Sequence, residues 1–337
     1  MKALIIGGTG TISSAVVKLA LSKGWELYVL NRGKKPLPCG VKGIIADIND
    51  EQTVSNSIRG LKFDVVAQFI AYGPADVERD IRIFSNHTAQ YIFISSASAY
   101  QKPINCYPIT ESTPLKNPYW DYSRKKIAAE EVLSRAYREQ SFPATIVRPS
   151  HTYDGSKPVF AIHGNKGVWQ TVRRILKGKP VIIPGDGTSL WTLTHSSDFA
   201  KGFVGLMGNP QAIGQAYHIT SDEVMTWNQI YSVIAKTCGK ELNALHIPSE
   251  YLAVHSGCYD FRGTLLGDKA NSVIFDNTKI KRAVPDFHCS ISMAEGLRTG
   301  TANLLEHREL QIIDPDFDNW CDDICDRFLR LNNLPNV

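Results

Sequence analysis

The chain has 337 residues, of which 43% are hydrophobic, and it carries a formal net charge of +4. This length allows one large domain or two modest ones, and the apolar content supports a full core. The mild charge excludes the strongly basic surface that is typical of nucleic-acid binding, so we do not expect a nucleic-acid partner. No apolar run approaches the length of a membrane span, and no charged leader precedes the first one. We therefore expect a cytoplasmic protein without membrane contact.

The seven cysteines and nine histidines show none of the spacings that are typical of metal sites. The cysteines are odd in number and scattered, and no Cys-x-x-Cys pair occurs. This pattern is typical of free thiols in a reducing compartment. The sequence predicts no metal site.

The N-terminus combines an apolar run (residues 3–6), a glycine-rich turn and an apolar helical pattern. Such a turn lets the backbone approach a pyrophosphate, and the following helix directs free N–H groups and its dipole at it. We therefore predict a dinucleotide site here, although a tight strand-to-helix turn without a ligand is the alternative. The predicted contacts are Gly7, Gly8, Thr9, Gly10, Thr11 and Ile12.

Strand and helix patterns alternate through the first 150 residues. We predict further strands at 26–30, 43–46, 63–71, 90–95 and 144–147, and helices at 54–58 and 120–138. The segment 72–89 shows little apolar helix signal. The strand at 63–71 is continuously apolar apart from Gln68, as expected of a strand buried on both faces. This order predicts an α/β fold with a Rossmann-type, doubly wound parallel sheet.

The pattern changes after residue 150. Residues 151–190 are rich in glycine and proline with one helix near 168–177, and residues 192–207 return to the sheet. We predict a dinucleotide-binding domain of residues 1–150 plus about 190–210. A smaller, interleaved substrate domain would comprise residues 151–189 and 211–337.

Asn31 and Arg32 follow the second strand, where a fold that prefers NAD places an acidic side chain for the ribose 2′-hydroxyl. Asn31 is uncharged and Arg32 could pair with a 2′-phosphate, so NADP is favoured over NAD. Arg32 could instead stack on the adenine or face solvent. Asp47, after the third strand, could accept from the adenine amino group or cap the next helix. Ile48 and Ala71 complete the predicted cofactor contacts near these strand ends.

Tyr122 and Lys126 form a Tyr-x-x-x-Lys pair on the long predicted helix, where residues i and i+4 share a face. A nearby ammonium, together with the positive nicotinamide of an oxidised cofactor, lowers a phenol pKa. The tyrosine can then exchange a proton with a carbonyl/alcohol pair, and Ser96, 26 residues earlier, can hold the same oxygen. For the pair alone, an ordinary exposed helix is the alternative.

With these residues, the chain resembles the extended branch of the short-chain dehydrogenase/reductase superfamily, which contains sugar epimerases and dehydratases. The resemblance also covers residues 148–153, residues 185–187, and His195 with Asp198. It implies that Ser96, Tyr122 and Lys126 form the catalytic triad, with Lys126 also holding the nicotinamide ribose. The further positions that it implies are Ser150 and His151 near the nicotinamide. A homodimer is a family expectation.

The chain departs from the family pattern at three places. The third loop glycine falls at Ser13, so helix–strand packing must be looser or adjusted. Residues 97–98 are Ala-Ser where dehydratases carry an acidic pair, so sugar dehydration is not expected. Trp191 and Leu265 stand where nucleotide-sugar enzymes usually place two arginines on the diphosphate. Arg173 or Arg262 could substitute for them.

Three aromatic or imidazole side chains are candidates for the substrate pocket, although such residues are more often part of a core: Tyr153, Trp191 and His195. The loop 7–13 and the segment 185–207 look most like an atypical subgroup. That subgroup contains nucleoside-diphosphate-sugar epimerases and chloroplast stem-loop RNA-binding proteins.

These features predict an NAD(P)-dependent oxidoreductase or epimerase that acts on a secondary alcohol or ketone of a sugar-like substrate, with Tyr122 as acid/base. A cofactor that stays bound would give epimerisation, and one that exchanges would give net oxidation or reduction, with the same motif residues. The alternative is a non-catalytic, NADP-responsive regulator or RNA-binding protein on the same fold. The intact set of Ser96, Tyr122 and Lys126 favours the enzyme.

Overall fold

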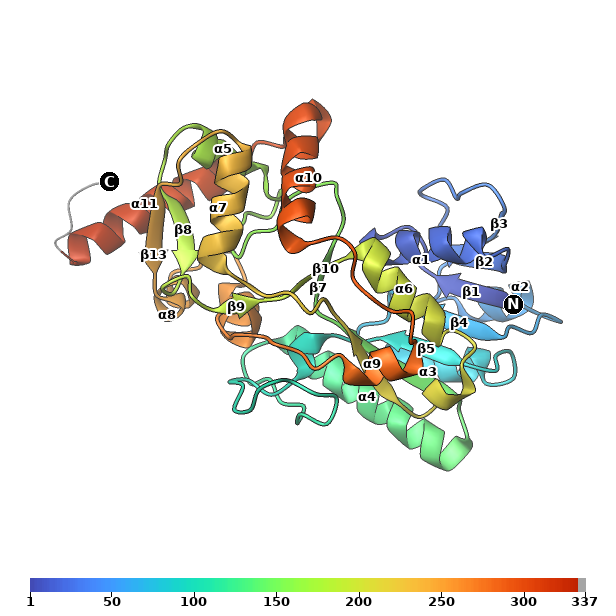
Figure 1. Cartoon of the computed structure of the whole chain (residues 1–337). Helices are drawn as coiled ribbons and strands as arrows, with labels where there is room; N and C mark the ends of the chain where they lie inside the picture. The colour runs from blue at the N-terminus through green and yellow to red at the C-terminus, as the bar shows by residue number, and fades with distance from the viewer. Residues whose placement is uncertain (333–337) are drawn as a thin grey trace.

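A seven-stranded parallel sheet is the centre of the computed structural model, which describes residues 1–332 (Figure 1). Its strands stand in the order β11-β6-β5-β4-β1-β2-β3, and every neighbouring pair is parallel. The order reverses beside β1, which places the carboxyl ends of β1 and β4 at the crevice where such sheets bind ligands. The strands are β1 (Lys2–Ile6), β2 (Glu26–Asn31), β3 (Val41–Ile45), β4 (Val65–Gln68), β5 (Tyr91–Ile94), β6 (Ala144–Pro149) and β11 (Ala216–Ile219).

Helices cover both faces of the sheet, because its central strands are apolar on both sides. One face packs against α1 (Thr11–Ser22), α6 (Ser196–Leu206) and α9 (Thr278–Ala283). The other packs against α2 (Glu51–Ser57), α3 (Pro74–Phe84) and α4 (Asp121–Gln140). In Figure 1, α1 and α6 lie above the sheet and α4 lies below it. The predicted doubly wound α/β fold is confirmed.

Two parts of the sheet domain differ from the sequence predictions. Residues 72–89 contain the helix α3, whose buried face includes Arg79 and Asp80 as well as apolar side chains, so apolar periodicity missed it. The helix begins with Pro74 after Gly73, a favoured start. Residues 216–219 form β11, which pairs with β6 at the sheet edge. The predicted assignment of this segment to the substrate domain is therefore wrong.

The remaining elements form a smaller lobe with its own apolar core, which is built around Trp227, Tyr231 and Phe317. It occupies the left half of Figure 1 and contains three two-stranded pairings, β7–β10, β9–β12 and β8–β13. Its strands are β7 (His151–Tyr153), β8 (Val181–Pro184), β9 (Leu190–Trp191), β10 (Leu193–His195), β12 (Met225–Thr226) and β13 (Ala244–Ile247). Its helices are α5 (Trp169–Leu176), α7 (Trp227–Thr237), α8 (Ser249–Val254), the π-helical η3 (Arg262–Lys269), α10 (Met293–Glu306) and α11 (Pro315–Leu331).

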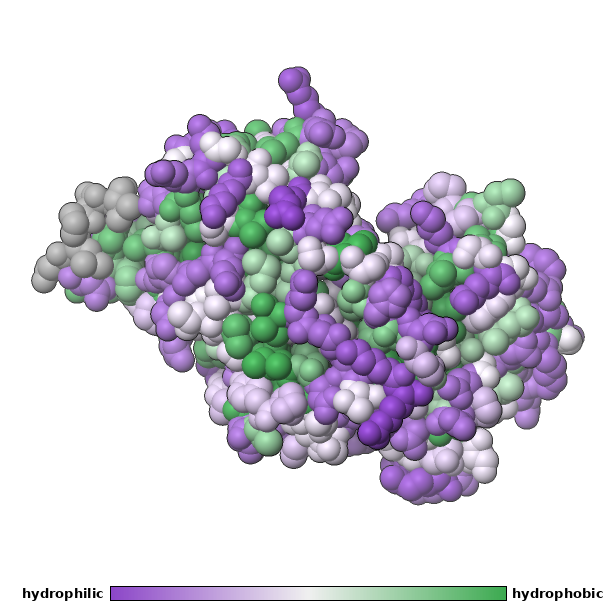
Figure 2. Space-filling model, viewed as in Figure 1, coloured by the Kyte–Doolittle hydropathy of each residue, from purple (hydrophilic) through white to green (hydrophobic). Residues whose placement is uncertain are grey.

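Three short 3₁₀ turns complete the described chain, η1 (Ala97–Ala99), η2 (Pro210–Ala212) and η4 (Arg308–Leu310). Polar side chains cover most of the face seen in Figure 2, and an apolar area lies near β9 in the middle of the view. None of the helices in residues 1–332 is both long and apolar enough to cross a membrane. The last part of the predicted substrate domain, 333–337, lies outside the described residues.

Candidate active site

The turn after β1 can be built only with glycine. Gly7 and Gly8 have φ angles of 107° and 72°, in the region that disfavours side chains. A Cβ at Gly8 would lie 2.6 Å from Cγ1 of Val29, and one at Gly7 would lie 3.0 Å from Cγ2 of Ile70. The backbone therefore passes close to its neighbours and turns directly into α1, so the first-turn N–H groups of that helix are available to an anion.

Ser13 replaces the third glycine of the family loop without opening the structure. Its side chain is buried, and its Oγ accepts a hydrogen bond from the N–H of Gly10 at 3.0 Å. The hydroxyl thus ties the turn to the first turn of α1. The expected change in the packing of the helix on the strand remains a prediction.

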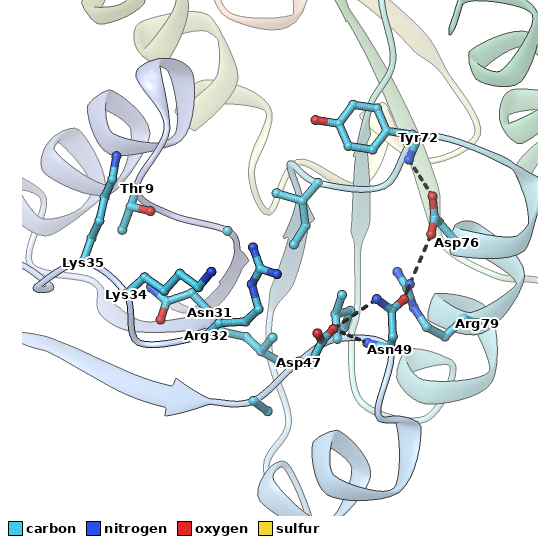
Figure 3. Close-up of a pocket in the computed structure, with 15 residues that line it drawn as sticks. Thr9, Asn31, Arg32, Lys34, Lys35, Asp47, Asn49, Tyr72, Asp76 and Arg79 are labelled. Atoms are coloured by element: carbon cyan, nitrogen blue, oxygen red, sulfur yellow. Dashed lines mark hydrogen bonds and ion pairs between the residues drawn. The ribbon is translucent and has the colours of Figure 1, made fainter. Parts of the chain in front are cut away.

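A cleft of about 480 Å³ opens at the carboxyl ends of β1, β2, β3 and β4 (Figure 3). It brings together six predicted cofactor residues from separate parts of the chain: Gly7, Thr9, Asn31, Arg32, Asp47 and Ile48. The geometry suits a dinucleotide, because the glycine turn lies at one wall and the ends of β2 and β3 form another.

The loop after β2 contributes a group of cations to this cleft. Asn31 accepts a hydrogen bond from the N–H of Gly33 at 2.8 Å, so its side chain shapes its own turn. Arg32, Lys34 and Lys35 line the cleft and are exposed. Figure 3 shows Arg32 and Lys34 pointing into it. The wall therefore presents positive charge where an NAD-preferring fold would present a carboxylate.

Asp47 is held in the cleft by Asn49, which donates to its Oδ1 from both the backbone N–H (3.0 Å) and the side-chain amide (3.1 Å). The alternative that Asp47 caps the following helix is wrong, because Asp50 caps α2 by accepting from the N–H of Thr53. Asp47 therefore faces the cleft with a fixed carboxylate.

Sequence reasoning missed several residues of the cleft, because they belong to the unpredicted α3 and the loop before it: Tyr72, Asp76 and Arg79. Arg79 is buried and pairs with Asp80 at 2.8 Å. Its Nη1 also donates to Asn49 at 2.7 Å, as the side chains in Figure 3 show. The Gly73-Pro74 helix start was the one local signal that could have indicated this element.

Lys126 is anchored on α4 between the ends of two strands. Its Nζ donates to the carbonyl oxygens of Ala71 at 2.7 Å and Ile94 at 2.8 Å, and lies 5.6 Å from the centre of the Tyr122 ring. Ser96 follows β5, and its Oγ lies 2.8 Å from that of Ser98. Ser123 in turn donates to Ser98 at 2.8 Å, so a chain of hydroxyls links this loop to α4.

Burial dominates the acid–base properties of these groups. It raises the pKa of Tyr122 to about 12, against a smaller opposite effect of the Ser96 hydroxyl. It lowers the pKa of Lys126 to about 8. The sequence expectation of a lowered phenol pKa combined the ammonium with a bound nicotinamide. In the protein alone burial raises this pKa, and the ammonium is bonded to two carbonyls. The contribution expected from a bound nicotinamide remains a prediction.

A second cavity, of about 360 Å³, lies beside Tyr122 and is lined by twelve residues. It joins two residues of the predicted triad with three that were predicted near the nicotinamide or substrate: Ser96, Tyr122, Ser150, His151 and Trp191. The ring of Tyr72, which lines the first cleft, lies edge-on to that of Tyr122 with 6.2 Å between centroids. The two cavities are therefore neighbours, with Tyr72 of one lining packed on Tyr122 of the other.

His151, which lines the second cavity, is uncharged at neutral pH, because burial lowers the pKa of its imidazole to about 3. Its ring lies edge-on to Trp191, with 6.3 Å between centroids. Trp191 is buried and stacks on Trp227. Ser150 donates to the carbonyl of Thr192 at 3.2 Å. These contacts hold the indole and imidazole rings in fixed places.

Two predicted substrate residues do not reach this cavity. Tyr153 lines a separate hollow of about 170 Å³ further along β7, with its hydroxyl packed against Gly296. His195 caps α6, where its Nδ1 accepts from the N–H of Ser197. Arg173 and Arg262, the suggested substitutes for the missing arginines, are also absent from the lining. The cavity therefore has no guanidinium in its wall.

Fold and site together define a class of nicotinamide-dependent enzymes. A profile of the NAD dependent epimerase/dehydratase family matches residues 3–220, and the chain belongs to this family.

Relatives at low identity span several activities. The chain is 24% identical to 2′-dehydrokanamycin reductase of Streptomyces kanamyceticus over 75% of this chain and 71% of the reductase. It is 23% identical to chloroplast stem-loop binding protein of 41 kDa b of Arabidopsis thaliana, over 71% of this chain and 63% of that protein. It is 31% identical to UDP-glucose 4-epimerase of Lactobacillus helveticus, over 44% of this chain and 51% of that protein. The matches thus span less than two thirds of the last two proteins.

Solved structures share the whole fold. UDP-glucuronic acid 4-epimerase from Bacillus cereus, in complex with UDP-glucuronic acid and NAD, aligns with a TM-score of 0.71 at 18% identity, covering 91% of this chain and 99% of that one. dTDP-glucose 4,6-dehydratase from Streptomyces venezuelae, with NAD and TYD bound, gives 0.72 at 19% identity, covering 92% and 98%. These similarities confirm the predicted Rossmann-type fold, and both neighbours bind NAD.

Proposed function

We propose that this chain is an NADPH-dependent oxidoreductase that reduces a ketone on a sugar-like ring, with Tyr122 as the proton donor. One observation carries the proposal: Ser96 and Tyr122 line a cavity next to the glycine-turn cleft, and the ring of Tyr122 packs on Tyr72 of that cleft. A dinucleotide in the cleft supplies hydride at its nicotinamide ring when bound. A substrate in the second cavity would then lie between that ring and the two hydroxyls.

Each member of the triad has a distinct role in this proposal. Ser96 donates a hydrogen bond to the substrate carbonyl oxygen, and Tyr122 donates the proton that this oxygen needs as hydride arrives. Lys126 already uses two of its three N–H donors on Ala71 and Ile94. The third is available for a ribose hydroxyl of the cofactor. Because the carbonyls fix the ammonium, Lys126 positions the cofactor rather than pairing with the phenol.

The protonation of Tyr122 favours reduction over oxidation. With a pKa of about 12, the phenol is protonated at neutral pH and is ready to donate. Removal of a proton from a substrate alcohol would first require the pKa of Tyr122 to fall, which the positive charge of an oxidised nicotinamide can bring about. The reductase relative, which covers 75% of this chain, supports the same direction. Epimerisation with a retained cofactor is the competing outcome.

The cofactor preference is proposed from the loop after β2. Arg32, Lys34 and Lys35 line the cleft, and Asn31 supplies no carboxylate for a 2′-hydroxyl. Guanidinium and ammonium groups form charge-assisted hydrogen bonds with phosphate. We therefore expect NADPH to bind more tightly than NADH, although the solved neighbours described above contain NAD.

The substrate is proposed to be smaller or less charged than a nucleotide sugar. A diphosphate that leaves water needs fixed cationic groups, and the lining offers Trp191 in place of an arginine. Leu265, at the second position, is fully buried. Sugar dehydration is not proposed, because Ala97 and Ser98 follow Ser96 in place of acidic residues.

Substitution of Tyr122 by Phe tests the proposal. Oxidation of NADPH would be followed with a panel of keto sugars, and Tyr122→Phe should lower turnover by roughly 10²- to 10⁴-fold while cofactor binding is retained. Tyr119→Phe, three residues earlier and outside the cavity lining, is the matched control. Unchanged turnover in Tyr122→Phe would refute the assignment. NADPH binding without turnover of any substrate would favour the non-catalytic, NADP-responsive alternative.

A further inference from the structure

The lining of the cavity beside Tyr122 contains a carboxyl group. Asp268 lies near the end of the π-helical segment η3 and lines the cavity together with Trp120 and Trp191. Its charge reaches Tyr122, where it acts to raise the phenol pKa. Asp268 is the one acidic residue in the lining, and that lining contains neither lysine nor arginine.

The carboxylate of Asp268 has free acceptor capacity. Within residues 1–332, the side-chain oxygens of Asp268 accept no hydrogen bond and form no ion pair. By contrast, Asp260 accepts a hydrogen bond from the N–H of Gly263, and Asp121 forms an ion pair with Lys125. Burial raises the pKa of Asp268, and the nearby charges of Lys102 and Lys269 oppose this rise. A carboxylate that lines a cavity and accepts no hydrogen bond from the protein can accept one from an N–H or O–H group of a ligand.

A second polar group in the same lining also lacks a hydrogen-bond partner among the described residues. Trp191 is 2% exposed, and its Nε1–H has no acceptor among the described residues. An indole N–H can only donate, so it requires an oxygen, such as a ring hydroxyl. The residues of the lining thus include one indole N–H without an acceptor, at Trp191, and one carboxyl group without a bonded donor, at Asp268, in addition to the hydroxyls of Ser96 and Tyr122.

Packing fixes Asp268 relative to the catalytic helix. The side chain of Trp120, the residue before α4, fills the space beside Gly263 and Gly267: an added Cβ would lie 2.2 Å from its Cδ1 at Gly263 and 2.8 Å from its Cβ at Gly267. Asn117 donates to the carbonyls of Ser98 and Gly267 at 2.8 Å and 2.7 Å. The segment η3 is therefore clamped to the loop of Ser96 and to the start of α4. π-helical turns of this kind often occur at functional sites.

We infer that this cavity selects a sugar-like ring that carries an amine, with Asp268 accepting a hydrogen bond from its ammonium group and Trp191 donating to a ring oxygen. The inference rests on the proposed function, because both concern the cavity beside Tyr122. Aromatic side chains in the lining add to the selection, since an ammonium is attracted to aromatic faces and a sugar ring packs against them. A volume of about 360 Å³, near the lower end of small-molecule sites, suits one ring rather than a nucleotide sugar.

An anionic ring is the competing occupant, because two lysines lie near Asp268. Lys102 is 2% exposed, and its Nζ is buried without a hydrogen-bond partner in the described part of the chain. Neither Lys102 nor Lys269 is part of the lining, so a ligand anion would meet Asp268 before either ammonium. Burial also lowers the pKa of both lysines. Asp268 is thus the ionisable side chain that a ligand in this cavity meets first, and an ammonium group beside it would favour its charged form.

Calorimetric titration of the NADP⁺-saturated protein tests the inference with rings of different charge: glucosamine at a pH where its amine is protonated, glucose, N-acetylglucosamine and glucose 6-phosphate. We expect glucosamine to bind roughly 10- to 100-fold more tightly than glucose, the range of a charge-assisted hydrogen bond. N-acetylglucosamine should lose this advantage, because acetylation converts the charged amine into a neutral amide. Glucose 6-phosphate should bind most weakly.

Asp268→Asn keeps the shape of the side chain and should remove most of the preference for the amine, while glucose affinity changes little. Asp121→Asn removes the same charge from the exposed first turn of α4, next to Tyr122 but outside the lining, and should keep the preference. Trp191→Phe should weaken all rings alike. Equal affinity for glucosamine and glucose, a preference that survives Asp268→Asn, tighter binding of the phosphate, or no binding of any ring would each overturn the inference.

These titrations separate the inference from the proposed function, because they measure binding and not turnover. Tyr122-dependent reduction of neutral keto sugars without any preference for an amine would leave the proposed function intact and refute the inference. An amine preference that requires Asp268, in a protein that never oxidises NADPH, would support the inference and refute the proposed function.

Discussion

Lys126 should destabilise the folded protein at neutral pH, and this penalty should decrease as the pH rises. Its side chain is 2% exposed, and burial lowers its pKa from 10.5 to about 8, although Asp76 and Glu130 partly oppose the effect. Between these two values, the unfolded chain still holds a proton that the folded protein has lost. Stability rises with pH wherever the unfolded state binds more protons. The sign of the dependence is therefore fixed by the direction of the pKa change.

The magnitude follows from the same two values. Below about pH 8 the ammonium is charged in both states, and the full penalty applies. The interval from 10.5 to about 8 corresponds to about 3 kcal/mol, at about 1.4 kcal/mol per pH unit. Loss of the hydrogen bonds to Ala71 and Ile94 in a Lys126→Met variant costs stability as well, but that cost does not depend on Lys126 titration. The slope with pH is therefore the informative quantity.

Urea unfolding of wild type and Lys126→Met, without cofactor and from about pH 7 to about pH 10.5, measures this slope. Between about pH 8 and about pH 10.5, the free energy of unfolding of the wild type should rise by about 3 kcal/mol relative to that of the variant. Lys125→Met, which removes an exposed lysine of the same helix, is the matched control. A difference between wild type and Lys126→Met that is flat with pH would refute the reasoning. The variant should also bind NADPH more weakly and turn over more slowly.

Three further predictions test other parts of the site. Arg32→Ala should lower NADPH affinity by roughly 10- to 100-fold and leave NADH affinity almost unchanged, as measured by quenching of intrinsic fluorescence; an unaltered NADPH preference would show that Arg32 points elsewhere. UDP-glucose, UDP-galactose and dTDP-glucose should bind weakly in calorimetry, and micromolar binding that is lost in Arg173→Ala or Arg262→Ala would restore a nucleotide-sugar substrate. Arg79→Leu leaves the buried carboxylate of Asp80 without its cation and should lower the free energy of unfolding by about 3–5 kcal/mol, so wild-type stability in urea would contradict the role given to this pair.

The sequence by itself determined those features whose parts are close together in the chain. The apolar run, glycines and helix of the first 22 residues specify the turn, because side chains at Gly7 and Gly8 would clash or be strained. Tyr122 and Lys126 share a helix face through their i, i+4 spacing, which needs no tertiary information. The parallel sheet followed from the alternation of buried strands and amphipathic helices, and its central strands are where they were predicted.

Only the tertiary structure decided which distant residues share the site and how they ionise. Asp268 lines the same cavity as Tyr122 because Trp120 packs against Gly263 and Gly267. This contact joins segments more than a hundred residues apart, so it leaves no local period in the sequence. The helix α3 escaped prediction because its buried face carries a compensated ion pair where an apolar stripe was sought. The pKa of Tyr122 in the protein alone is raised because burial, a property of the packed fold, is its largest determinant, and burial cannot be read from the Tyr-x-x-x-Lys spacing.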